Sequence, residues 1–510
     1  MKGQVDFFVP GNTVDSTTLR YRLPLHTVEG EELMLVGTKT IRPSCAFSAS
    51  RLWKATTEVN VQIASRGESL GAGVLRIPLS SFQRQIRSFR STGPTFAALP
   101  ALLMFLLYFI LQISLFFLHP LIPRWFTSAK RYNRFEAKQP TSTHEISASD
   151  GVTVKLELYS PSKPLNKPPI LFLPGVTGLN PEHSIYTLPF QRTNMVDYFT
   201  SHGYSCYVLV PRWSFNARTA KDCTVFDSRL DIAAALQHIN QGNNSQKPYI
   251  IAHCQGSVAL AMGLLDGSIP SSQILGITAN SVFITQIFPF WNSVKASSPL
   301  LIRLYEFLDG PYFPISFLLP PTPNHKNKDV KEKKKEKKKD ILQHALDAIL
   351  SFYPVPHARD LCTSSTCHRT SFAFGLLWDH KNLSPATHDN IDRFFTGTYT
   401  KLLSHVVRTG SRGGCLEYKQ AVPDAQLERL RGLPILFMSG AENQVFSPES
   451  TLRDYELLRR EFGEGEGEGL YRRFLVEGYG HLDTIVGDRA VEDVFWRVKG
   501  HLEGLVASNK

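Results

Sequence analysis

The residues with the clearest chemical potential lie in the stretch AHCQG, residues 252–256. An apolar string, KPYIIAHC, leads into it, and a helix-like string, QGSVALAMGLLDG, leads out of it. This pattern predicts a sharp turn between a strand and a helix, with Cys254 at the apex. The backbones crowd together at such a turn, and Ala252 and Gly256 supply small residues two positions before and two positions after the apex. The stretch is therefore typical of a nucleophile elbow with cysteine at the position of the nucleophile.

The chemistry that this position indicates is acyl transfer through a covalent intermediate on sulfur. Backbone N–H groups at the start of the following helix are expected to lower the pKa of the Cys254 thiol and to stabilise an oxyanion. The elbow resembles that of the α/β-hydrolase superfamily, and this resemblance implies that His481 in EGYGHLD is the base, which would take the thiol proton and later pass it to the leaving group. The same resemblance implies that the oxyanion-hole donors are the backbone N–H groups of Gln255 and of Val176 in the loop PGVTG.

The resemblance also implies a third residue that orients His481 and that follows the apolar string PILFMSG. The position three residues after Gly440, where the superfamily usually has an aspartate, is Asn443 here, and Glu442 lies next to it. Either Glu442 orients the imidazole as a carboxylate or Asn443 does so as a neutral amide, and we favour Glu442. A thiolate–imidazolium pair depends less on a third group than a serine does. Asp483 is a weaker candidate for the same role.

Other polar residues near these motifs are expected to be structural. We expect this of His253 and Ser257 beside the apex, and of Arg212 and Trp213, which should brace the edge of a sheet. Cys362 and Cys367 in CTSSTC could pair or share a metal, but zinc needs further close ligands and only His368 is adjacent. We therefore expect structural thiols or a local disulfide, no metal and no cofactor. The remaining histidines of the region are expected on helix surfaces or in packing, for example His380 and His388.

The elements that must position these residues follow an alternating pattern from about residue 143. Apolar strand-like strings alternate with helix-like strings, which predicts a mostly parallel sheet with helices on both faces. The predicted core has two parts, residues 136–282 and 431–510. Residues 283–430 interrupt it and are too long for a loop, so we expect a cap or lid with a disordered lysine-rich loop at 324–340. Residues 1–92 carry short alternating runs and are predicted to form a small β-rich unit.

Residues 93–126 are expected to form a membrane-spanning or membrane-embedded helix. Within them, residues 96–118 are 23 residues without a charge, which is long enough to cross a bilayer. Basic residues flank this segment on both sides, so its orientation stays undecided. The N-terminus lacks the pattern of a cleavable secretory signal. The sequence thus predicts association with a membrane.

Composition limits the other function classes. The chain has 510 residues, 42% of them hydrophobic and 20% charged, as expected of a globular protein. Of its net charge of +11, residues 326–340 contribute nine lysines against four acids, or +5, in one low-complexity run. No nucleic-acid-binding pattern accompanies the charge, so no nucleic-acid partner is expected. The glycines of GEGEGEG, 463–469, do not have the spacing of a dinucleotide-binding loop.

The strand–helix order and the elbow resemble the α/β-hydrolase superfamily over residues 143–282 and 431–510. The resemblance implies an α/β-hydrolase fold with a helical cap insertion and a small N-terminal β-rich unit. Four stretches look like a narrower group, the hydrolase-type domains found alone or joined to cholesterol-oxidase-like flavin oxidoreductases of the glucose–methanol–choline class: AHCQGS, CTSSTCHRTSF, LWDHKNLSPATHDNI and GYGHLD. No flavin fingerprint is present, so the resemblance implies at most a separate flavin oxidoreductase as a partner.

The expected function is hydrolysis of an ester, thioester or lactone of an apolar, lipid- or sterol-like acyl substrate. The cap, the apolar segment and a set of aromatic lid residues favour such a substrate, namely Phe290, Trp291, Phe307, Tyr312 and Phe313. The alternatives are an acyltransferase that uses the same cysteine and a non-catalytic, membrane-tethered binding protein with the same fold.

Overall fold

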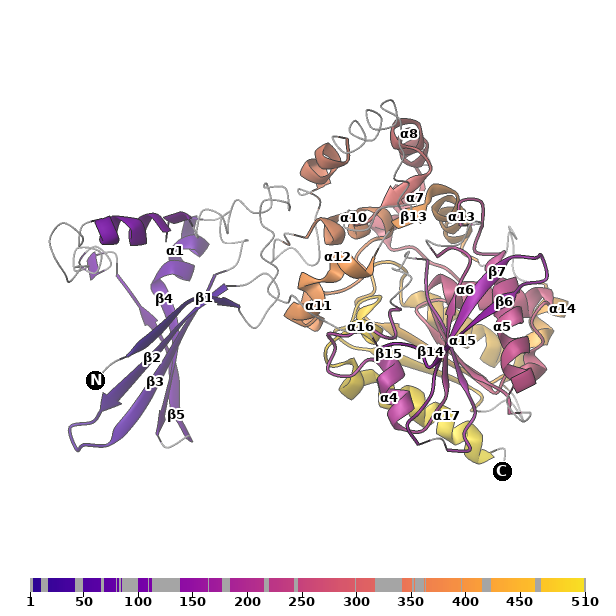
Figure 1. Ribbon diagram of the computed structural model, residues 1–510, viewed down its shortest axis with the longest axis horizontal. Coiled ribbons are helices and arrows are strands. Elements are labelled where there is room, and N and C mark those ends of the chain that lie inside the picture. The colour runs from indigo at the N-terminus through magenta and orange to yellow at the C-terminus, as the bar shows by residue number, and fades with distance from the viewer. Residues whose placement is uncertain are drawn as a thin grey trace. The chain divides into compact units, whose positions relative to one another are not determined.

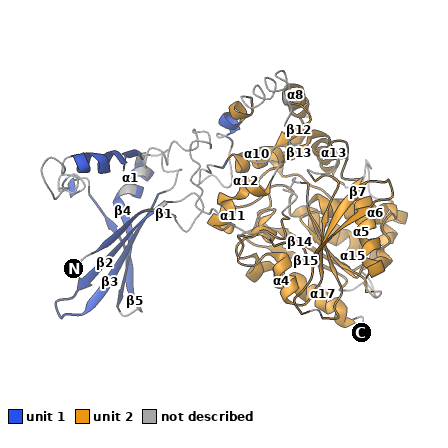
Figure 2. Ribbon diagram, in the orientation of Figure 1, with its two compact units in different colours: residues 1–129, 347–364 blue, residues 130–346, 365–510 orange. Residues whose placement is uncertain are grey.

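The computed structural model divides the chain into two compact units, residues 1–129 with 347–364 and residues 130–346 with 365–510 (Figure 2). The structure describes residues 3–10, 17–41, 49–65, 68–78, 80–81, 84, 100–108, 110–111, 138–163, 165–176, 184–214, 220–242, 246–298, 300–316, 342–350, 353, 362, 364–395, 397–414, 423–463 and 469–508. The lysine-rich loop predicted at 324–340 lies outside the described residues, as does most of GEGEGEG.

The first unit contains an antiparallel sheet whose five strands follow one another in chain order. Its elements are β1 (Gln4–Pro10), β2 (Thr17–His26), β3 (Glu32–Ile41), α1 (Ala49–Thr57), β4 (Glu58–Ser65) and β5 (Glu68–Arg76). Alternate residues of β4, Val59 and Val61, are buried, as the period of a strand requires. The expectation of an N-terminal β-rich unit is confirmed.

The apolar segment predicted to enter a membrane is described only in part. Residues 100–108 and 110–111 are helical, and residues 112–137 lie outside the description. Among the described residues, no helix has both the length and the apolar character that crossing a bilayer requires. Membrane association of residues 93–126 stays a prediction.

The second unit is built on an eight-stranded sheet with the order β15-β14-β11-β10-β8-β9-β7-β6 (Figure 1). Its strands are β6 (Ser142–Ser147), β7 (Thr153–Tyr159), β8 (Ile170–Leu173), β9 (Cys206–Val210), β10 (Tyr249–His253), β11 (Gly276–Asn280), β14 (Ile435–Gly440) and β15 (Tyr471–Val476). All neighbours from β15 to β9 pair in parallel, whereas β6 and β7 form an antiparallel hairpin at the edge. The mostly parallel sheet expected from the alternating pattern is confirmed, and the order is that of an α/β-hydrolase fold.

Helices cover both faces of this sheet, because every residue of β8, β10 and β11 is buried although successive side chains point to opposite faces. The covering helices are α4 (Met195–Ser201), α5 (Ser228–Gly242), α6 (Gln255–Asp266), α15 (Glu449–Phe462) and α17 (Trp496–Ser508). α6 packs on β10 and on α5, while α17 packs on β11. The carboxyl end of β10 and the start of α6 therefore meet at the centre of the sheet.

Between β11 and β14 the chain forms the cap elements. They are α7 (Phe290–Ala296), α8 (Leu300–Asp309), β12 (Tyr312–Pro314), α10 (Ser365–Phe374), η5 (His380–Asn382), α11 (Pro385–Asp389), α12 (Ile391–Phe394), β13 (Gly397–Tyr399), α13 (Thr400–Ser411) and α14 (Asp424–Leu427). The carboxylate of Asp454 fixes the start of this segment by accepting hydrogen bonds from the backbone N–H groups of Ile284 and Thr285. The cap thus begins from a point that is anchored to the core.

Arg212 follows β9 and has the structural role expected of it. Its guanidinium donates to Asp231 at 2.7 Å and to Asp150, in the turn between β6 and β7, at 2.5 Å. Asp231 is fully buried and Arg212 is only 3% exposed. The ion pairs join the edge hairpin to α5 and lie away from the cavity described below.

Substitution of Arg212 by methionine is expected to lower the free energy of unfolding by about 3–5 kcal/mol, because Asp231 would keep a buried charge without its partner. Urea denaturation followed by circular dichroism measures this loss. Arg192→Met is the matched control: its ion pairs with Asp488 and Glu492 are on the surface, and its effect should not exceed about 1 kcal/mol. Equal losses in the two variants would contradict the assignment.

Candidate active site

Cys254 lies at the junction of β10 and α6 with φ +53° and ψ −129°. It is one of two non-glycine residues in the described part of the chain with a positive φ. This backbone conformation costs about 1–3 kcal/mol and persists only where surrounding contacts hold it. Its N–H donates to the carbonyl of Asn280, which fixes the turn to β11. The predicted position of Cys254 at the apex of a strand–helix turn is confirmed.

The crowding predicted around the apex is also present. A Cβ atom added to Gly256 would lie 2.4 Å from the carbonyl oxygen of Pro174, so only glycine fits there. A Cβ atom added to Gly175 would lie 3.0 Å from Cβ of Cys254. Both contacts bring the loop after β8 close to the elbow, and this loop carries Val176.

Burial dominates the electrostatics of the thiol. It raises the pKa of Cys254 to about 12, although backbone N–H groups of Gln255 and Val176 act in the opposite direction. The expectation of a lowered thiol pKa is therefore wrong in its net sign, because desolvation outweighs the helix N-terminus. The same two N–H groups are the predicted oxyanion donors, and the structure places them beside the sulfur.

His481 approaches Cys254 from the loop after β15. One ring nitrogen of His481, one of His253 and the sulfur of Cys254 all lie within 4.8 Å of one another. The two imidazole rings are 4.7 Å apart between centroids. Burial lowers the pKa of His481 well below its ordinary value, with a further contribution from His253, and burial lowers the pKa of His253 to about 3. At neutral pH the site thus holds a neutral thiol and two neutral imidazoles.

Neither candidate for the third position contacts the ring of His481. Glu442 is partly exposed, and its carboxylate accepts a hydrogen bond from Lys381 at 3.0 Å. The side-chain oxygen of Asn443 accepts hydrogen bonds from the backbone N–H groups of Val445 and Phe446, so the amide stabilises the loop in which it lies. Within the described residues, neither ring nitrogen of His481 has a hydrogen-bond partner. The expectation that Glu442 or Asn443 orients His481 is therefore corrected.

Asp483 shapes the loop of His481 instead. One of its carboxylate oxygens accepts from the backbone N–H of Gly480 at 3.0 Å and from the amide of Asn382 at 2.5 Å. Burial raises its pKa to about 6.

Ser257, in contrast, turns away from the apex and donates to the carbonyl of Ala252, as a structural residue would.

A cavity of about 130 Å³ opens above Cys254. Both core and cap residues line it, and those from the cap helices α7, α8, α10 and α13 are Asn292, Lys295, Ala296, Ile302, Tyr305, Phe372, Ala373, Phe374, Thr400, Leu403, Val406 and Val407. Of the expected aromatic lid residues, only Phe313 lines this cavity. Phe290, Trp291 and Phe307 are 71–86% exposed, because they lie on the outer faces of their helices, and Tyr312 packs against Tyr399.

The sequence also missed the second imidazole of the site. His253 was expected to be structural, yet it lines the cavity and lies against His481. Its position at the last residue of β10, directly before the apex, was the available signal. The cap residues of the cavity wall had no such signal, since no spacing rule connects them to Cys254.

The raised pKa of Cys254 predicts its reactivity as a function of pH. Alkylation of this residue by iodoacetamide should keep rising above pH 9, because the thiol ionises near pH 12, whereas an ordinary thiol levels off soon after its pKa of about 8.5. Peptide mass spectrometry after timed labelling measures the rate at each pH, with the urea-unfolded chain as the control. A plateau below neutral pH would show a preformed thiolate–imidazolium pair and would contradict the prediction.

Comparisons with known proteins give likenesses in structure only. No family model matches the chain, and no curated protein matches its sequence. Among solved structures, it is similar to the α/β-hydrolase GrgF from Penicillium sp. sh18, with 14% identity, a TM-score of 0.41 and coverage of 72% of this chain and 99% of that one. It is similar at 13% identity and a TM-score of 0.43 to a thermostable carboxyl esterase from Bacillus coagulans, over 72% of this chain and all of that one. It is also similar to a putative aryl esterase from Burkholderia cenocepacia, with 14% identity and a TM-score of 0.39, over 72% of this chain and 100% of that one.

Proposed function

We propose that this chain is an ester or thioester hydrolase that uses Cys254 as its nucleophile and His481 as its base. One observation carries the proposal: the sulfur lies at a strained strand–helix apex, within 4.8 Å of a ring nitrogen of His481 and beside two backbone N–H groups, at the floor of a cavity. This arrangement supports the proposal, because these groups would supply the nucleophile, the base and the oxyanion donors that acyl transfer needs.

The proposed reaction has two halves. The sulfur attacks the substrate carbonyl carbon while the thiol proton passes to His481, and the carbonyl electron pair moves to oxygen, where N–H groups of Gln255 and Val176 stabilise it. Collapse of this intermediate breaks the bond to the leaving group, which takes the proton from His481 and leaves an acyl thioester on Cys254. Water then gives a proton to His481 and attacks the thioester, which releases the acid and restores the thiol.

The surroundings of His481 favour activated acyl substrates. Among the described residues, no carboxylate is hydrogen-bonded to the ring of His481, so the charge of the imidazolium formed in the first half is poorly compensated in a buried site. Aryl esters and thioesters have good leaving groups, which depart with little help from proton transfer by His481. Apart from Lys295, the cap side of the cavity consists mainly of apolar side chains, which supports an apolar acyl chain.

The test is acylation of the purified full chain by a short-chain 4-nitrophenyl ester and by an acyl thioester. Intact mass should show one added acyl group, peptide mapping should place it on Cys254, and Cys254→Ala should lose both the adduct and turnover. Cys223→Ala removes another buried thiol and should keep both. Full turnover by Cys254→Ala would contradict the proposed mechanism.

A non-catalytic binding function is the second candidate. Two observations favour it: the raised pKa of the Cys254 thiol, and the lack, within the described part of the chain, of a hydrogen-bond partner for the ring of His481. In that case the cavity holds an apolar ligand that is not turned over. A fluorescent fatty acid should then bind equally well to wild type and to Cys254→Ala, and neither ester should acylate the wild type.

A further inference from the structure

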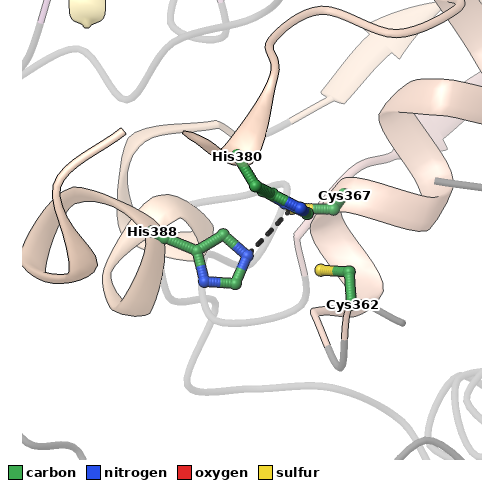
Figure 3. Close-up of side chains that lie close together, drawn as sticks. All are labelled: Cys362, Cys367, His380 and His388. Atoms are coloured by element: carbon green, nitrogen blue, oxygen red, sulfur yellow. Dashed lines mark hydrogen bonds between the residues drawn. The ribbon is translucent and has the colours of Figure 1, made fainter. Parts of the chain in front are cut away.

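A second cluster of buried cysteines and histidines lies in the cap, apart from the residues around Cys254. Its members are Cys362, Cys367 in α10, His380 in η5 and His388 in α11 (Figure 3). One donor atom from each lies within 4.8 Å of every other, and all four side chains are buried. Both cysteines are present as thiols, so the local disulfide considered from the sequence does not form. We propose that these four residues bind a structural Zn²⁺ ion.

The distances within the cluster fit a tetrahedral zinc site. The sulfur of Cys367 is 3.5 Å from Nε2 of His380 and 3.5 Å from Nε2 of His388. Zinc binds sulfur at about 2.3 Å and nitrogen at about 2.0–2.1 Å, and tetrahedral angles then separate the two donor atoms by about 3.5 Å. The two imidazole rings approach at right angles with centroids 4.5 Å apart, so both can direct a nitrogen at one point (Figure 3).

The fourth donor comes from Cys362. Only four residues separate it from Cys367, so the short connection keeps the two sulfurs near each other. The backbone N–H of Ser364 donates to the sulfur of Cys362 at 3.3 Å, which favours the thiolate form that a metal requires. Two thiolates and two neutral imidazoles bring the charge of the complex to zero, as suits a buried position, and the two thiol protons are released to solvent.

The ligand types select the metal, and the intervals resemble those of known zinc sites. A set of two sulfurs and two imidazole nitrogens is typical of zinc. The spacing is C-x4-C-x12-H-x7-H, and the first two intervals fall within those of C2H2 zinc sites, whereas the last is longer. The site was not predicted from the sequence because only residues adjacent to CTSSTC were considered as ligands, and the two histidines come 13 and 21 residues after Cys367.

The proposed ion would hold together a segment that contacts the loop of His481. Between the ligands Cys367 and His380, the carbonyl of Leu377 accepts from the backbone N–H of Leu482 at 2.6 Å. Just after His380, Asn382 donates to Asp483. Phe372 and Phe374 from the same segment line the cavity. The site would therefore stabilise both the cap and the wall beside His481, and it does not depend on the proposed reaction.

The test measures zinc in the purified full chain by plasma mass spectrometry. We expect about one zinc ion per chain, and loss of that zinc in Cys367→Ser and in His380→Gln. Cys223→Ser removes a buried thiol outside the cluster, and Cys254→Ala removes the thiol of the other histidine–cysteine group; both should keep the zinc. Zinc that is lost with Cys254 rather than with Cys367 would overturn the proposal.

A second measurement needs no variant and covers the case in which Cys367→Ser fails to fold. The wild-type chain, stripped of metal and reloaded with Co²⁺ under reducing conditions, should show sulfur-to-cobalt charge-transfer bands and the intense visible bands of tetrahedral coordination. A chelator should lower the Tm of the zinc-bound wild type. A wild-type chain without zinc and without these cobalt bands would overturn the proposal.

Discussion

Substitution of His481 by alanine is expected to lower kcat for a 4-nitrophenyl ester by about 10²–10⁴-fold, the usual contribution of a general base. The thiol of Cys254 is neutral at pH 7 because burial raises its pKa to about 12. It can attack only if a neighbouring group removes its proton in the transition state, and His481 supplies a neutral ring nitrogen within 4.8 Å. KM should change little, since most of the cavity wall is formed by other, apolar side chains.

Glu442→Gln is the control for this prediction. Its carboxylate contacts Lys381 near the surface and not His481, so kcat should remain close to that of wild type. Asn443→Ala should act differently, by loosening the loop that carries Phe446, whose ring lies 6.0 Å from that of His481. A fall in Glu442→Gln as deep as that in His481→Ala would restore Glu442 as the orienting acid.

His253 offers a way to separate two roles at the same site. Its ring lies against His481 and contributes to the lowered pKa of that residue. In His253→Gln the pKa of His481 should therefore rise, and the acidic limb of the kcat/KM profile should move to higher pH. An unchanged kcat/KM profile in His253→Gln would show that His253 does not influence the pKa of His481.

The sequence predicted the parts of the site that depend on short spacing and chain order. Cys254, Gly256 and Gln255 occupy fixed positions around one strand–helix junction, and His481 follows the last strand of the sheet. The order of elements alone brings these groups to the same edge of the sheet, so no knowledge of side-chain contacts was needed. The same holds for Arg212, whose position after β9 indicated a bracing role.

The features that the sequence did not predict correctly depend on the direction of side chains and on segments that are distant along the chain. Whether Asn443 faces His481 or its own loop is decided by two backbone N–H groups downstream of it. The pKa of Cys254 depends on how completely the cap and the core bury it, and no local pattern encodes that burial. His380 and His388 meet Cys367 only because α10, η5 and α11 fold back on one another.

Gly256 is expected to be a position next to the reacting groups that tolerates no side chain. In Gly256→Ala the new Cβ atom would lie 2.4 Å from the carbonyl oxygen of Pro174 and 2.9 Å from that of Leu173, and both are backbone atoms that cannot rotate away. The overpacking should lower the free energy of unfolding by about 1–3 kcal/mol. Gly500→Ala is the matched control: it lies in α17 with nothing within 4 Å of its added Cβ, and it should gain about 0.5–1 kcal/mol.

The loss of activity in Gly256→Ala should exceed what its loss of stability explains. The displaced backbone, Leu173–Pro174, leads directly into Val176, whose N–H group lies beside the sulfur of Cys254. Loss of one oxyanion donor costs about 10²–10³-fold in kcat, so kcat should fall by that amount even at a temperature where the variant is fully folded. Denaturation curves and kinetics on the same preparation separate the two effects. A folded variant with wild-type kcat would show that Val176 does not take part in stabilising the oxyanion.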